Sequence, residues 1–395
     1  MNKEDIVIVG AVRTPMGGFQ GVLGPASAPE LGSAAIAAAL ERAGLTVDDP
    51  QEIIMGCVLP AGLGQAPARQ AALGAGLPKS AGCTTINKMC GSGMKATMLA
   101  HDLIKAGSND VIISGGMESM TNAPYLLPKA RQGMRMGHGQ VLDHMFLDGL
   151  EDAYDQGRLM GTFAEDCAGK YGFSREQQDE FAIRSLTRAR QAIGDGTFAD
   201  EITAVTIATR RGKQVVDHDE QPHQANIDKI PSLRPAFRKD GTVTAANSSS
   251  ISDGAAALVL TTVRTAEKHG LQPLARILGH TTFAHEPGWF TTAPVHAIKG
   301  LLQALDMEAK DIDLFEINEA FAVVTMAAMS ELDLPADKVN VHSGACALGH
   351  PIGASGARIL VTLLNAMHKY DRNLGIASLC IGGGEATAMA VERVR

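Results

Sequence analysis

Cys90 stands where a strand-forming segment gives way to a helix-forming one. Residues 84–86 are β-branched, and apolar side chains recur at helical spacing over residues 96–103. Gly91 and Gly93 allow a sharp turn that leaves the thiol accessible. The unpaired N–H groups of a helix N-terminus favour thiolate over thiol, so Cys90 is a candidate nucleophile. The alternative is a cysteine that only packs in the core, which is the usual role of a free cysteine.

Three later segments carry groups that could act on the same substrate. His350 lies in the Gly-His-Pro turn at 349–351, before a second glycine-rich helix start, and is a candidate base. Cys380 is followed by glycines 382–384, whose backbone amides can hold an oxyanion. Asn318 follows a further expected strand. A lone histidine is usually structural or on the surface, and only its turn makes His350 a better candidate.

The elements expected around these residues occur twice. An alanine-rich helix at 31–47 leads through an acidic turn to a strand at 52–56, and residues 297–318 repeat the pattern at a constant offset of 262 positions. Glycine-rich helix starts at 92–93 and 355–356 each lead to a strand that ends in Gly-Gly. Internal duplication is the simplest account, and chance matches between alanine-rich helices are the alternative. Duplicated halves would bring the two helix starts together near a pseudo-twofold axis.

Composition excludes several classes of protein. The 395 residues carry a formal charge of −8, which argues against a general nucleic-acid-binding surface. No run of about 18 apolar residues is present, so we expect no membrane span. The six cysteines form no C-x-x-C pair, which favours neither a zinc site nor a disulfide framework. We therefore expect a cytoplasmic protein.

Residues 117–245 differ from the repeated halves. Methionine, glycine, proline and charged residues gather there, and the strand signal is weak. One helix is expected at 176–193, with Ser174 as its N-cap. A long insertion of this kind is typical of a binding or interaction region.

Taken together, the motifs resemble the four signature segments of the thiolases. The matching segments are 86–93 with Cys90, 318–321 (Asn-Glu-Ala-Phe), 349–358 with His350, and 380–384 (Cys-Ile-Gly-Gly-Gly). They occur in the same order, and the resemblance covers essentially the full length. Residues 233–237 and 241–249 are most similar to the biosynthetic, acetoacetyl-CoA type.

The resemblance implies an α/β thiolase fold. In that fold two βαβαβαββ halves pack in five layers (α, β, α, β, α), and a loop domain binds coenzyme A. We expect the N-terminal half to comprise residues 1–120 and 246–270, the loop domain 121–245, and the C-terminal half 271–395. The resemblance also implies a homotetramer, built as a dimer of dimers.

The implied activity is that of an acetyl-CoA C-acetyltransferase. It condenses two acetyl-CoA reversibly to acetoacetyl-CoA and CoA, through an acyl-thioester on Cys90. By analogy with the family, His350 activates Cys90, and Cys380 exchanges the α-proton. The backbone amides of Cys90 and Gly382 hold one oxyanion, while His350 and a water on Asn318 hold the enolate.

The resemblance also implies which residues contact the substrate. The residues expected to bind the coenzyme A thioester are Leu150, Met160, Ala236, Phe237, Ala245, Ser249 and Phe321. The resemblance implies that coenzyme A thioesters are the substrates, and the implied reaction requires no metal and no redox cofactor.

Several positions depart from the family pattern. Glu385 follows the glycines behind the oxyanion amides, and His342 and Ser343 replace an Asn-Gly pair. Leu159, Pro222 and Lys229 stand where the family has residues that face coenzyme A. These changes leave open a 3-ketoacyl-CoA thiolase for longer chains. A non-catalytic acyl-CoA-binding protein is a further alternative, which the intact Cys90, His350, Cys380 and Asn318 disfavour.

Overall fold

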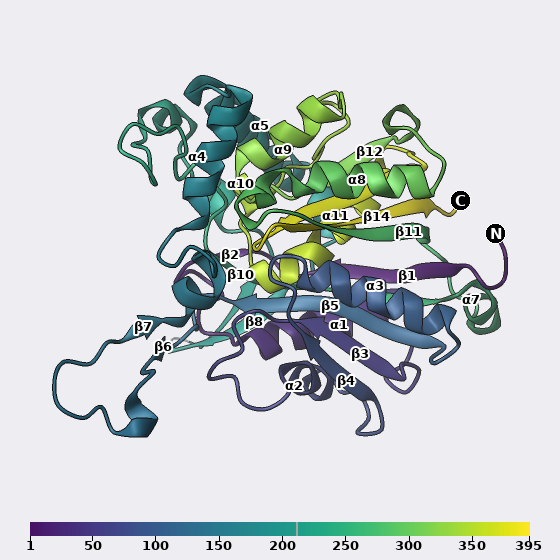
Figure 1. Ribbon diagram of the computed structural model, residues 1–395. Helices are drawn as coiled ribbons and strands as arrows, with labels where there is room; N and C mark the ends of the chain where they lie inside the picture. Colours follow the sequence, from purple (N-terminus) through teal and green to yellow (C-terminus); the bar gives the residue numbers. More distant parts are fainter. Residues whose placement is uncertain (211) are drawn as a thin grey trace.

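The computed structural model describes residues 1–210 and 212–395, which build two related sheets joined at their edges (Figure 1). The strand order is β12-β13-β14-β11-β1-β10-β5-β3-β4. The N-terminal sheet contains β1 (Ile6–Arg13), β3 (Glu52–Gly56), β4 (Gly82–Ile86), β5 (Val111–Ser119) and β10 (Ser252–Thr262). The C-terminal sheet contains β11 (Ala275–Ala284), β12 (Leu314–Ile317), β13 (Leu374–Ile381) and β14 (Glu385–Arg393). Among the residues that the structure describes, two residue pairs, in β1 and β11, connect the sheets.

Strand register confirms the duplication. In the first half β3 pairs in parallel with β4, with Ile53 opposite Cys83. In the second half Phe315, which is 262 positions after Ile53, forms a parallel bridge to Val339. The counterpart of β4 is therefore reduced to one bridge. The order of the remaining strands is the same in both halves.

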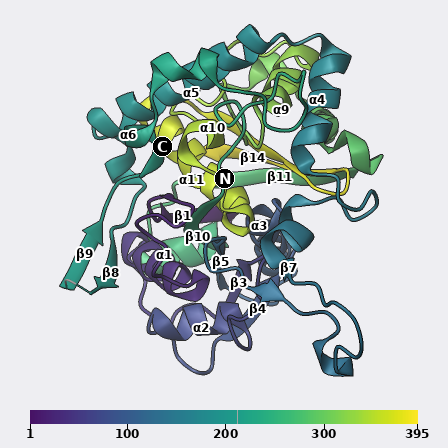
Figure 2. The same ribbon diagram turned by 90° about the vertical axis from the view of Figure 1, so that its left-hand side faces the viewer.

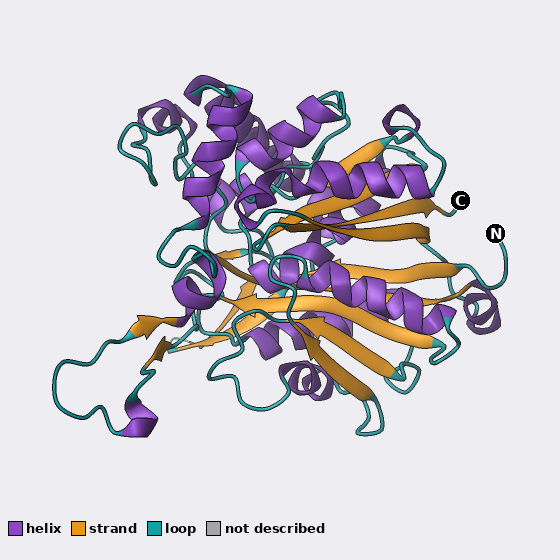
Figure 3. Cartoon of the chain, viewed as in Figure 1, coloured by secondary structure: helices purple, strands orange, loops and turns teal. Residues whose placement is uncertain are grey.

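Helices complete five layers (Figures 1 and 3). One outer layer holds α1 (Ala28–Ala43) and α2 (Pro67–Gly74), the centre α3 (Ser92–Lys105) and α11 (Ile352–Lys369), and the other outer layer α8 (Ala293–Ala304) and α9 (Ala322–Glu331). Separate apolar clusters fill the spaces between the layers. The thiolase-type layering expected from the sequence is thus present. None of the described helices is both long and apolar enough to cross a lipid bilayer.

Local sequence sets the ends of α1. Ser27 and Glu30 form a capping box at its start, and Gly44 ends it with a left-handed φ of 72°. The helix expected at 31–47 therefore begins three residues earlier and ends four residues earlier. Its alanine-rich face lies against β1, β5 and β10.

The two central helices cross at a pair of glycines. A Cβ on Gly93 of α3 would lie 2.7 Å from the backbone N of Ala357, and one on Gly356 of α11 would lie 2.4 Å from the N of Met94. Each helix therefore needs a residue without a side chain where it meets the other. This reciprocal contact brings the starts of α3 and α11 together.

The region between the repeated halves contains helices and two hairpins (Figure 2). Its longest helix, α5 (Arg175–Gly194), begins after a Ser174–Gln177 capping box, as expected. A second helix of this region, α4 (Met160–Tyr171), packs against α9. The hairpins are β6–β7 (Tyr125–Leu126, Leu142–Asp143) and β8–β9 (Val205–Thr209, Gly212–Val216). The boundary of the loop domain at 121–245 stays a prediction.

Candidate active site

A cavity of about 650 Å³ opens where both helix starts meet the glycine-rich end of β13. It is lined by Cys90, His350, Cys380 and Gly382. All seven residues expected to bind the coenzyme A thioester also line it, namely Leu150, Met160, Ala236, Phe237, Ala245, Ser249 and Phe321. Asn318 does not line the cavity. Residues from both halves and from the intervening region thus form one site.

Cys90 lies two residues before α3, not in its first turn. Met89 has a left-handed φ of 47°, which is uncommon for a side-chain-bearing residue and marks the sharp turn into the helix. Gly91 fits because a Cβ there would lie 2.4 Å from Cδ1 of Ile381 at the end of β13. The turn therefore holds the half-buried Cys90 against the glycine loop of the other half.

Burial sets the protonation state of Cys90. It raises the pKa of the thiol to about 11, although the backbone N–H groups of Gly382 and of Cys90 itself act in the opposite direction. The nearby Glu118 carboxylate also raises this pKa. Burial therefore outweighs the thiolate-favouring effect that was expected of the helix N-terminus. Both N–H groups are near enough to act on the sulfur, as an oxyanion hole next to this atom requires.

His350 is held in one orientation by its own helix. Its Nδ1 lies 2.6 Å from the Ser355 hydroxyl, which donates to the carbonyl of Pro351 at 2.9 Å. Because that hydroxyl proton is engaged, Nδ1–H is the donor to Ser355, and Nε2 carries the lone pair. Nε2 has no hydrogen-bond partner among the described residues.

The imidazole is neutral at rest. Burial and, to a lesser extent, the Arg358 charge together lower the pKa of His350 to about 3. A neutral imidazole with a free lone pair is the form that can accept a proton from a thiol. Gly349 precedes it at φ 101°, and a Cβ there would lie 2.1 Å from the Ser252 hydroxyl, so the turn requires glycine.

Cys380 is buried near the end of β13. Burial raises the pKa of its thiol well above the usual value, and the neighbouring Cys90 adds to the effect. The following glycines, Gly383 and Gly384, have φ values of 93° and 88°. A Cβ on Gly384 would lie 2.5 Å from the carbonyl of His285, so the backbone folds tightly beyond the second sulfur.

Asn318 lies behind the cavity wall. It follows β12 and is fully buried, and its Oδ1 accepts a hydrogen bond from Arg358 at 3.4 Å. Arg358 in turn pairs with Glu316 at 2.9 Å. The Nδ2 of Asn318 has no partner among the described residues. The amide is thus fixed through its oxygen, while its N–H donors stay free.

Sequence reasoning missed the carboxylate that supports this arrangement. Glu118 is buried on β5 and accepts backbone N–H groups from Val58 at 2.9 Å, Leu59 at 3.1 Å and Gly353 at 2.8 Å. Burial raises the pKa of Glu118 to about 7. It ties the start of α11, next to His350, to the loop after β3. An acidic residue directly after the run of small and apolar residues 111–117 was the signal available in the sequence.

The positions that depart from the family pattern have different surroundings. Glu385 forms an ion pair with Lys88, so its carboxylate is engaged beside the glycine loop. Leu159 lines the cavity, whereas Pro222 and Lys229 do not. Met89, Phe290 and Ile352 also line it and were not singled out from the sequence.

Two family models cover nearly the whole chain. "Thiolase, N-terminal domain" matches residues 6–264, and "Thiolase, C-terminal domain" matches residues 271–393. The chain belongs to the thiolase family. Similar thiolases include acetyl-CoA acetyltransferase 2 of Arabidopsis thaliana, 50% identical over 99% of this chain and 98% of that protein. The acetyl-CoA acetyltransferase of Escherichia coli is 49% identical over 99% of this chain and 100% of that protein.

Solved thiolase structures match the whole fold. The crystal structure of the Bacillus anthracis acetyl-CoA acetyltransferase is similar with a TM-score of 0.96 and 41% identity, covering 99% of both chains. A thiolase from Ascaris suum in complex with coenzyme A gives a TM-score of 0.93 at 41% identity, covering 99% of this chain and 100% of that one. The thiolase fold expected from the sequence is confirmed.

Proposed function

We propose that this thiolase is an acetyl-CoA C-acetyltransferase, which interconverts two acetyl-CoA with acetoacetyl-CoA and CoA. The observation that carries the proposal is the meeting of two thiols, one imidazole and two backbone amides in a single apolar cavity. The names of the similar proteins support the same activity.

Cleavage of acetoacetyl-CoA begins with proton transfer from Cys90 to Nε2 of His350. The thiolate attacks the keto carbon, and the amides of Cys90 and Gly382 stabilise the oxyanion. When the bond between the keto carbon and the α-carbon breaks, the acetyl group stays on Cys90. The electron pair passes to the enolate of the departing acetyl-CoA.

The second thiol completes the proton balance. Cys380 rests as a thiol because burial raises its pKa, and this form protonates the enolate carbon to release acetyl-CoA. Free CoA gives its thiol proton to the Cys380 thiolate, and the resulting CoA thiolate attacks acetyl-Cys90. The Cys90 thiolate then leaves and regains its proton from His350. Condensation is the reverse sequence, and neither direction changes an oxidation state.

Asn318 acts from behind the cavity wall. Its free Nδ2 donors fit a bound water, which together with His350 would stabilise the enolate oxygen. The Arg358–Glu316 pair holds the amide in this orientation. Asn318 is therefore a positioning residue that reaches substrate through water.

The apolar walls favour the pantetheine arm and a short acyl chain. Phe237 and Phe321 pack edge to face with ring centroids 6.1 Å apart, and Met160 Sδ lies 3.7 Å from the place of a Cβ on Gly382. Met160 thus covers the oxyanion loop and limits the room beyond it. Leu159 adds an apolar side chain to the same wall, which keeps longer substrates as the second candidate.

The ratio of kcat/KM for thiolysis of acetoacetyl-CoA to that of 3-ketohexanoyl-CoA distinguishes the two candidates. We expect the C4 substrate to be preferred by at least about tenfold, the cost of misplacing one or two methylenes in a packed pocket. A preference for the C6 substrate would assign the chain to the longer 3-ketoacyl-CoA thiolases.

Mass spectrometry of the intact protein after incubation with acetyl-CoA tests for catalysis itself. We expect one acetyl group on the unaltered chain and none on Cys90→Ala. Thiolysis that persists in Cys90→Ala would contradict the nucleophile assignment. Binding without acetylation would favour the non-catalytic acyl-CoA-binding alternative.

We further propose a homotetramer in the cytoplasm. β4 ends the strand order with an open edge, so a second copy can extend the sheet there. The β6–β7 hairpin carries exposed apolar residues that suit a further contact. All six cysteines are unpaired, which fits a reducing compartment.

A further inference from the structure

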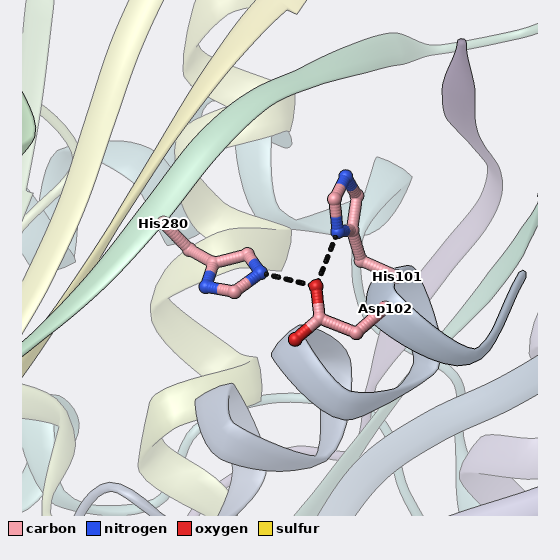
Figure 4. A group of neighbouring side chains, drawn as sticks. All are labelled: His101, Asp102 and His280. Atoms are coloured by element: carbon pink, nitrogen blue, oxygen red, sulfur yellow. Dashed lines mark hydrogen bonds and ion pairs between the residues drawn. The ribbon is translucent and has the colours of Figure 1, made fainter. Parts of the chain in front are cut away.

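His101, Asp102 and His280 do not line the cavity, and they form a cluster with their polar atoms turned toward one another (Figure 4). Nδ1 of His101 and Nε2 of His280 each lie 2.9 Å from Oδ1 of Asp102. These three ligand atoms all lie within 4.8 Å of one another. His101 and Asp102 belong to α3, whereas His280 belongs to β11 of the other half.

The cluster depends on the tertiary structure, because it joins side chains from two separate elements. Adjacent positions on a helix do not face each other, so His101 reaches Asp102 only because its ring turns along the helix surface. The two imidazole rings stand edge to face at 88°, with centroids 5.1 Å apart. Their side chains are 18% and 15% exposed, while Asp102 is 54% exposed. Solvent therefore reaches the cluster from the side of the carboxylate.

We propose that this cluster is a binding site for one divalent metal ion of the zinc type. Two imidazole nitrogens and one carboxylate oxygen are a donor set that zinc binds at about 2.0–2.2 Å, with water as the fourth ligand. Each neutral imidazole can present the lone pair of the nitrogen that faces Asp102, with its proton on the other ring nitrogen. The nearby Lys105 donates a hydrogen bond to the backbone carbonyl of Glu4, so its ammonium group has a partner outside the cluster.

The bound ion would link the two thiolase halves. It would join α3 of the N-terminal half to β11 of the C-terminal half, next to the short β1–β11 pairing that connects the two sheets. His101 lies about 14 Å along α3 from Ser92 at 1.5 Å per residue, so the ion would not touch the reacting groups. Its expected effect is on stability. At 100 times Kd, the ion would shift the unfolding equilibrium about a hundredfold toward the folded state.

Calorimetric titration of the full chain with ZnCl₂ tests the site. A Cys90→Ala background removes the active-site thiol that could itself bind zinc. We expect one zinc per chain, a raised Tm, and at least about tenfold weaker binding in each of His101→Asn, Asp102→Asn and His280→Asn.

The matched control is His218→Asn. His218 also contacts a neighbouring aspartate, with Nδ1 2.7 Å from Oδ1 of Asp217, but it lies outside the cluster. We expect its zinc binding to equal that of the background. Cobalt supplies a second readout, since N and O ligands give visible bands without thiolate charge transfer.

Two results would overturn the proposal. One is that no zinc binds when one equivalent per chain is added. The other is that the three cluster variants bind zinc as tightly as the background does. Asp102→Asn alters a half-exposed side chain, so it keeps the test valid even if a histidine variant folds poorly. The metal-free Tm of each variant separates loss of the ligand from loss of the fold.

Discussion

At the scale of single residues, Cys90 and His350 meet as a neutral thiol and a neutral imidazole. Burial disfavours both charged forms, raising the pKa of Cys90 to about 11 and lowering that of His350 to about 3. Proton transfer between them therefore costs free energy until substrate brings charge into the site. The amides of Cys90 and Gly382 then stabilise the oxyanion that forms.

The alkylation rate of Cys90 reports this resting state. Because iodoacetamide reacts with thiolate and the thiol pKa is about 11, we expect the rate to rise about tenfold per pH unit between pH 7 and 10. Peptide mass spectrometry identifies the alkylated cysteine at each pH. A rate that levels off below pH 8 would instead indicate a thiolate–imidazolium pair.

Ser355 controls which ring nitrogen of His350 carries the proton. Ser355→Ala removes the acceptor for Nδ1–H, and we expect kcat to fall about 10- to 100-fold, as for a lost hydrogen bond of 1–3 kcal/mol. Thr362→Val is the control, since it removes a buried hydroxyl of the same helix that binds Glu201. An unchanged kcat in Ser355→Ala would show that the tautomer of His350 does not affect catalysis.

The identity of the reacting residues was more predictable from the sequence than their protonation state. Cys90, His350 and Cys380 could be chosen from sequence because glycines and a proline surround them in recognisable turns. Their protonation depends on burial by segments far apart in the chain, which the local pattern does not contain. For the same reason Glu118 was missed, and the position of Asn318 behind the wall was not foreseen.

At the scale of elements, the crossing of α3 and α11 decides where the reacting groups meet. The repeat at 92–93 and 355–356 could be read from sequence, since glycine spacing is local. The reduction of the counterpart of β4 to a bridge at Val339 could not, because pairing depends on the partner strand. The short hairpins of the middle region lacked enough strand residues to give a pattern.

Gly356→Ala tests the crossing. The new Cβ would lie 2.4 Å from the backbone N of Met94, which cannot move without shifting α3. We expect the free energy of unfolding to fall by about 1–3 kcal/mol. Gly300→Ala is the matched control at an exposed position of α8, where a Cβ meets nothing within 4 Å, and it should gain about 0.5–1 kcal/mol. Equal stability of both variants in denaturant titrations would mean that the helices do not meet closely.

At the scale of the whole molecule, the two halves differ at their outer edges. The C-terminal sheet ends at β12, which Val339 bridges, whereas the N-terminal sheet ends at β4 with no further strand among the described residues. The β6–β7 hairpin projects from the body beside this half (Figure 1). Both features leave surface that a second copy can cover.

Met136 in the β6–β7 connection is the sharpest probe of that assembly. Its side chain is fully exposed, and Leu127 and Val141 in the same connection are also exposed, which is unusual for apolar residues of a monomer. If the connection packs against another copy, Met136→Asp buries an unpaired charge there and should convert tetramers to dimers in sedimentation experiments.

Val215→Asp, on the exposed strand β9, is the control and should leave the tetramer intact. Because Met136 does not line the cavity, we expect the dimeric variant to keep its thiolysis kcat. Tetramers that persist in Met136→Asp would exclude this connection from the interface.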